Sequence, residues 1–279
     1  MKTSLALVLA IAAFPALAAR AATERAETRQ AAQKHYSIQV ADGGWGGANL
    51  DDLNAVYHSA INEIAVHLDA ADLAFEPIRI QHGNRNPVVN YSRSVRGEII
   101  VELNAKGNRW SQHAYQAAHE FCHILCRYKK ADRSNLWFEE SLCELASIYA
   151  LRQMAITWKT DPPYPNWKDY SKSLESYVSD VENNHNSIGS EDFLTWFNQF
   201  EPELRSNPTR REDNGRIALE LLPLFESYPA GWQSLPHLNT GPGEKEQTFY
   251  LYMKNWHTNT PGRHQKFVAK IGEKFGLSL

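Results

Sequence analysis

The sequence predicts an α+β protein, with a small mixed sheet and three helices in residues 35–160 and a mostly α-helical part in residues 161–279. Short alternating or β-branched segments, typical of strands, occur in the first hundred or so residues. Apolar residues recur at helical spacing in residues 51–70 and in most of the chain after residue 111. A proline-rich stretch, Asp161-Pro162-Pro163-Tyr164-Pro165, interrupts that spacing and predicts the boundary between two subdomains.

Residues 1–18 have the features of a signal peptide. Lys2 precedes a short apolar run, Pro15 ends the run, and Ala16-Leu17-Ala18 fits the rule for cleavage after small residues. Because the run is too short to span a bilayer, we expect export and a secreted or periplasmic location rather than a membrane anchor. Residues 19–34 are rich in Ala, Arg, Glu and Gln, and we expect a flexible leader or a frayed helix there.

The first subdomain, residues 35–160, alternates strands and helices. Its early elements are a weakly alternating strand at 35–40, an amphipathic helix at 51–70, a short strand at 76–81 and a polar turn at 84–87. Residues 97–104 form the best strand of the chain, because they are β-branched and end in a turn signal. Ser111 is expected to cap a helix that runs to about Arg127, and a second helix begins at Ser134 or Asn135 and continues past Ala150.

The second subdomain is predicted to be helical. Its helices are expected at residues 172–181, 190–200, 214–227, 247–256 and 264–275. Pro223 should kink or split the third of these, because proline has no N–H for the helical ladder.

Composition limits the possible partners. Hydrophobic residues at 43% and charged residues at 22% are ordinary for a globular protein, and the net charge is −3. No basic patch indicates a nucleic-acid partner, and no later stretch is long and apolar enough for a membrane span. The three cysteines allow at most one internal bridge, Cys122–Cys143 or Cys126–Cys143, and buried free thiols are an equal alternative. The oligomeric state stays open.

The segment His119-Glu120-Phe121-Cys122-His123 predicts a metal-binding site. On a helix, residues four apart return to the same face, so both imidazoles can bind one ion. Glu120 lies beside that face and can reach a water held on the metal. The apolar residues Ala114, Ala117, Phe121, Ile124 and Leu125 give the segment a side to bury, which supports the helix.

A third ligand has to come from elsewhere. The metzincin arrangement needs Gly and His three and six residues after the second histidine, where this chain has Cys126 and Lys129. The next predicted helix instead contains Leu136-Trp137-Phe138-Glu139-Glu140-Ser141-Leu142-Cys143-Glu144. This stretch resembles the third-ligand helix of the gluzincin clan of zinc peptidases, which commonly reads Trp-Leu-x-Glu-Gly-x-Ala-Glu.

The resemblance implies that Glu140 is the third zinc ligand and that Glu144 is an acidic partner behind a ligating histidine. Glu139 is the rival ligand, but four residues after it stands Cys143, which would supply no such partner. The resemblance also implies a zincin-like fold for residues 35–160, with the strand at 97–104 as the rim of the cleft. An oxyanion-stabilising residue is expected from a later set of candidates, Tyr149, Tyr164, Tyr170, Tyr177 and His185.

The chain departs from the clan in two places. Ser141 replaces the usual Gly, and the Gly-x-Met-Glu-Asn stretch of clan aminopeptidases is missing, so the chain looks closest to uncharacterised secreted bacterial members. We therefore expect a secreted zinc peptidase with one Zn²⁺ per chain, Glu120 as general base, and a peptide or protein as substrate. The alternatives are a catalytically silent metal- or peptide-binding relative, and a carbohydrate-binding or scaffold protein in which the eight tryptophans line a surface.

Overall fold

The computed structural model describes residues 24, 27–129, 134–186, 192–241 and 246–279. The expected signal peptide, residues 1–18, lies outside the described residues. Of the expected leader, residues 27–33 are helical. Arg29 in this segment binds Glu63 at 2.8 Å and the Thr157 hydroxyl at 2.7 Å, so it is held against two helices of the first subdomain.

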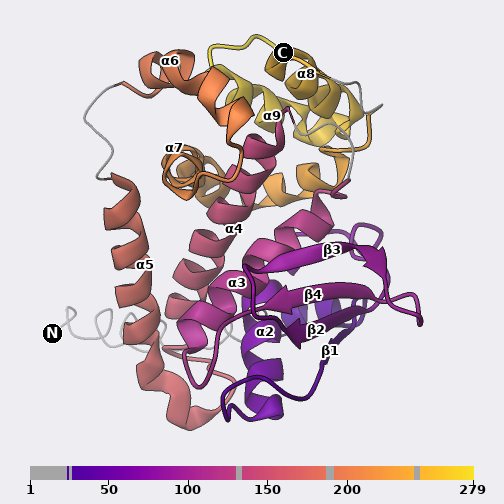
Figure 1. Ribbon diagram of the computed structural model, residues 1–279, viewed down its shortest axis with the longest axis vertical. Coiled ribbons are helices and arrows are strands. Elements are labelled where there is room, and N and C mark those ends of the chain that lie inside the picture. Colours follow the sequence, from indigo (N-terminus) through magenta and orange to yellow (C-terminus); the bar gives the residue numbers. More distant parts are fainter. Residues whose placement is uncertain (1–23, 25–26, 130–133, 187–191, 242–245) are drawn as a thin grey trace, which may run out of the picture.

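A four-stranded mixed sheet lies at one side of the molecule (Figure 1). Its strands, in spatial order, are β1 (Ile38–Val40), β2 (Ile78–His82), β4 (Ile99–Leu103) and β3 (Val88–Arg93). The first three run parallel, and β3 pairs antiparallel with β4 at the edge. The predicted α+β class and the small mixed sheet are confirmed. Strand β3 is a correction, because the sequence predicted only a polar turn between residues 81 and 97.

Three helices of the first subdomain pack together beside this sheet: α2 (Leu50–Ala65), α3 (Trp110–Leu125) and α4 (Leu136–Thr157). The Asn49 side chain accepts the N–H of Asp51 and so caps α2. Helix α3 begins one residue before the predicted cap, so Ser111 lies inside it. Because α3 and α4 lie side by side, side chains from both can meet (Figure 1).

The rest of the described chain is helical, as predicted. It comprises η1 (Pro165–Tyr170), α5 (Ser171–Asn186), α6 (Phe193–Ser206), α7 (Arg211–Ser227), η2 (Pro229–His237), α8 (Phe249–Asn259) and α9 (Gly262–Lys274). Pro223 lies inside a continuous α7, so the helix is not split there. Among the helices of the described residues, none combines the length and apolar character needed to cross a membrane.

Helix α4 is buried on nearly every side because α2, α3, α5 and α7 all contact it. At its start, Trp137 and Phe138 pack against aromatic rings of the second subdomain, including Phe249 and Phe275. Burying each such side chain stabilises the fold by about 1.5–3 kcal/mol. The two subdomains therefore share one hydrophobic core, and the backbone that carries Glu139, Glu140 and Glu144 is fixed within it.

The cysteines are free thiols. Cys122, Cys126 and Cys143 are all buried, and the Sγ atoms of Cys122 and Cys126 lie 4.0 Å apart. The structure thus agrees with the second of the two sequence alternatives, in which the cysteines are small apolar side chains of the core.

Candidate metal centre

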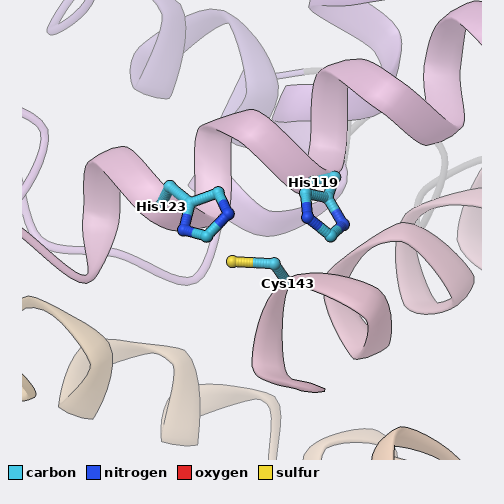
Figure 2. Close-up of side chains that lie close together, drawn as sticks. All are labelled: His119, His123 and Cys143. Carbon is cyan, nitrogen blue, oxygen red and sulfur yellow. The ribbon is translucent and has the colours of Figure 1, made fainter. Parts of the chain in front are cut away.

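Two histidines project from α3 toward α4 (Figure 2). His119 and His123 lie one helical turn apart, and their ring centroids are separated by 5.2 Å. Both side chains are largely buried, with 19% and 11% of their surface exposed. The helical spacing therefore does what the sequence predicted and brings both rings to the same side of α3.

The Glu140 carboxylate reaches both rings from α4. Its Oε2 lies 3.4 Å from Nε2 of His119 and 3.8 Å from Nε2 of His123. Two ligand atoms bound at about 2.0–2.1 Å to one tetrahedral ion lie about 3.4 Å from each other. The Glu140 carboxylate thus lies close to the separation from each histidine that a shared ion requires.

Cys143 lies near the same point. His119, His123 and Cys143 form a group whose candidate ligand atoms all lie within 4.8 Å of one another, and this group could hold a metal ion (Figure 2). The Cys143 side chain, however, is fully buried and is absent from the lining of the pocket described below, whereas Glu140 lines it. Of the two possible third ligands, Glu140 is the one beside open space.

From the sequence, Glu139 is a rival third ligand, but in the structure it contacts the other nitrogen of the His123 ring. Its Oε1 lies 2.7 Å from Nδ1 of His123, on the side of the ring away from Glu140. When Nδ1 carries the ring proton and donates a hydrogen bond to Glu139, the Nε2 lone pair is free for a metal. Glu139 is therefore placed as a partner behind a histidine, a role that the sequence assigned to Glu144 alone.

Glu144 lies behind the other histidine. Its Oε2 is 3.9 Å from Nδ1 of His119, longer than a hydrogen bond. Its Oε1 accepts the Tyr115 hydroxyl and lies 2.9 Å from Nε2 of His185. Glu144 is 2% exposed, so these contacts hold a buried carboxylate in place.

The electrostatics of the site favour a cation. Four carboxylates, those of Glu120, Glu139, Glu140 and Glu144, surround two imidazoles. Burial alone would lower the pKa of His123, but its hydrogen bond to Glu139 and the charges of Glu139, Glu140 and Glu120 raise this pKa to about 10. A bound divalent ion would offset this concentration of negative charge.

A pocket of about 460 Å³ opens over the two histidines. Its lining includes Pro87, Val88, Val89 and Tyr91 from the region of β3, and Thr209, Arg211 and Asn214 from the region where α7 begins. Strand β3 is thus the rim of the pocket, whereas the sequence assigned the rim to residues 97–104, which form β4 behind it. This correction follows from the position of β3 at the edge of the sheet.

Glu120 is among the residues that line this pocket. Its side chain is buried, with 3% of the residue exposed. Burial raises the pKa of Glu120, while the neighbouring His119 and His123 act in the opposite direction. The pocket thus holds a buried carboxylate beside the two histidines.

The candidates for an oxyanion-stabilising residue lie away from the pocket lining. The Tyr149 hydroxyl is 3.0 Å from Nε2 of His67, the Tyr170 hydroxyl accepts the N–H of Ser111, and His185 holds Glu144. Tyr164 and Tyr177 likewise pack against aromatic rings, those of Trp167 and Tyr115. The tyrosines that do line the pocket, Tyr91, Tyr115 and Tyr128, carry no motif that the sequence analysis could have used.

Searches of family models, of curated proteins and of solved structures return no match for this chain.

Proposed function

We propose that this protein is a secreted zinc-dependent peptidase with a zincin-like catalytic subdomain. The observation that carries the proposal is the approach of Glu140 Oε2 to Nε2 of both His119 and His123, at 3.4 and 3.8 Å. Two imidazoles and one carboxylate are the donor set of catalytic zinc sites that keep an open fourth position. The open position would face the pocket, which Glu140 and both histidines line.

His119, His123 and Glu140 would hold the ion. A zinc ion so held supplies a Lewis acid that polarises a carbonyl oxygen and lowers the pKa of water to roughly 7. Glu120, which lines the same pocket, would take the proton of the attacking water and pass it to the departing amine. Glu139, on Nδ1 of His123, keeps that imidazole in the tautomer whose Nε2 can bind the ion.

Strand β3 supports a peptide as the substrate class. It is the edge strand of the sheet, and its side chains Val88 and Tyr91 are 39% and 45% exposed at the pocket wall. An extended peptide can add to such an edge through backbone hydrogen bonds, which place a peptide carbonyl over the floor of the pocket. This mode of binding suits an unfolded segment of protein.

The test measures zinc content and cleavage together. The mature protein is purified, its zinc is quantified, and cleavage of an unfolded protein is followed with and without a chelator. Glu120→Gln should keep zinc and fold while cleavage falls by about 10²–10⁴-fold, because only proton transfer is lost. The matched control is Glu212→Gln, an exposed carboxylate in the first turn of α7, which should cleave like wild type.

The outcomes separate the alternatives. Zinc near one per chain with chelator-sensitive cleavage, lost in Glu120→Gln, supports the peptidase. Zinc without cleavage by the wild type points to a silent metal-binding relative. Wild-type protein that takes up no zinc contradicts the metal centre altogether.

A further inference from the structure

The carboxylate behind His123 is held by a residue of the second subdomain. Glu139 Oε1 is 2.7 Å from Nδ1 of His123, and its other oxygen, Oε2, accepts the side-chain amide of Asn239 at 2.8 Å. Asn239 follows η2 and stands one hundred residues after Glu139. A chain of contacts therefore runs from the imidazole through α4 to the C-terminal helices.

The direction of the Asn239 amide is set by its other contacts. Its Oδ1 accepts the Tyr252 hydroxyl from α8 at 2.9 Å, so Nδ2 is the atom that faces Glu139. Nδ2 also donates to the carbonyl of Cys126, the C-cap residue of α3, at 2.8 Å. The amide thus joins the end of the histidine helix to the carboxylate on the next helix.

A carboxylate held at one oxygen can rotate about its last side-chain bond, and a carboxylate held at both oxygens is fixed in plane and direction. Glu139 is 5% exposed, so water offers little replacement for a lost amide. If Asn239 releases Oε2, then Oε1 is free to leave Nδ1, and the His123 ring loses the contact that sets its tautomer.

We propose that Asn239 is a positioning residue of the metal centre, which acts on His123 through Glu139. This inference rests on the proposed zinc site. The competing role is purely structural, in which Asn239 only ties the end of α3 through the Cys126 carbonyl. The two roles differ in one respect, namely whether the effect of Asn239 on metal binding disappears when Glu139 is already disabled.

The experiment is a double-mutant cycle on zinc affinity, measured in the full chain by competition with a chelator. Asn239→Leu should weaken zinc binding by about tenfold or more, and Glu139→Gln by about 10–100-fold, the range for partners of metal-bound histidines. The double variant should bind zinc no more weakly than Glu139→Gln alone, because both changes break the same chain of contacts. The matched control is Asn259→Leu, an exposed asparagine at the end of α8, which should bind like wild type.

Two further measurements guard against a folding defect. Tyr252→Phe keeps every other atom but removes the hydroxyl that orients the amide, and it should weaken zinc binding by a smaller, several-fold factor. Cobalt in place of zinc reports ligand geometry through its visible absorption, and the spectra of Asn239→Leu and Glu139→Gln should be altered in the same way.

Unchanged zinc affinity in Asn239→Leu overturns the inference. So does a double variant whose loss is the product of the two single losses, since that result assigns Asn239 to the Cys126 carbonyl alone. A wild type that binds zinc but cleaves nothing refutes the peptidase while leaving this cycle as informative as before. A wild type that binds no zinc refutes both.

Discussion

Gly215→Ala should destabilise the protein, although helix propensity favours alanine. Gly215 lies inside α7 and packs against the buried His185 of α5. A Cβ added at Gly215 would overlap the His185 ring. The same ring places Nε2 2.9 Å from Glu144, so the overlap would also disturb this contact with a buried carboxylate.

Three free-energy contributions decide whether Gly215→Ala stabilises or destabilises the protein. Alanine in place of glycine in a helix interior gains about 1 kcal/mol. Overpacking a filled site costs about 1–3 kcal/mol, and a lost hydrogen bond to a buried carboxylate costs about 1.5–3 kcal/mol. Even the lower values of both costs exceed the gain, which leaves Gly215→Ala less stable than wild type by about 1.5 kcal/mol or more.

Urea unfolding of metal-free protein measures this difference. The matched control is Gly262→Ala, at the start of α9, where an added Cβ meets no atom within 4 Å and stability should be equal or higher. In the background His185→Ala, which leaves room for the new methyl, Gly215→Ala should become neutral or stabilising. If Gly215→Ala is instead about 1 kcal/mol more stable in the wild-type background, then the His185 ring is not locked in place and the reasoning fails.

Three further predictions follow from other parts of the molecule. Zinc at about a thousand times its dissociation constant should raise the free energy of unfolding by about 4 kcal/mol, and excess chelator should abolish the gain. Burial lowers the pKa of His113 to about 4, below the value of about 6.5 in the unfolded chain. The folded state therefore disfavours the protonated imidazole, and the free energy of unfolding should fall by about 3 kcal/mol as the pH drops from 6.5 to 4. The unfolding free energy of His113→Gln should therefore depend less on pH in that window. Arg29→Ala should lower the unfolding free energy by about 1–3 kcal/mol, since it removes a charged partner from the buried Glu63; a change under 0.5 kcal/mol in urea unfolding would contradict this.

The parts of the site that depend on local geometry were accessible from the sequence. His119 and His123 share a helix, and a spacing of four residues fixes their relative position whatever surrounds them. Glu140 required one further step, the choice between two adjacent glutamates, and the structure brings its carboxylate to both imidazoles. The role of Glu139 depends on how α3 and α4 pack, and no spacing within one helix reports on that packing.

Strand β3 was missed for a physical reason. Of its six residues only Val89 is buried, and the segment follows the turn signal Asn86-Pro87, so neither alternation nor a hydrophobic run indicates a strand. Its pairing with β4 is also irregular between Val89 and Arg93. An edge strand of this kind joins the sheet through its backbone and buries one side chain, so its amino-acid sequence carries no clear strand pattern.

Residues after the proline-rich boundary contact the two carboxylates that lie behind the histidines. Behind each histidine stands a carboxylate from α4, and each carboxylate is held by a residue from beyond the proline-rich boundary: Glu139 by Asn239 and Glu144 by His185. The partners in these two pairs are 100 and 41 residues apart in the sequence. Hydrophobic periodicity predicts which residues of a helix are buried, but it does not predict which buried polar side chains contact each other. Residues after 161 thus hold two carboxylates of α4, and these carboxylates lie beside the two histidines of α3. The position of the His123 imidazole therefore depends on residues beyond that boundary, because Glu139, its hydrogen-bonding partner, is held in part by Asn239.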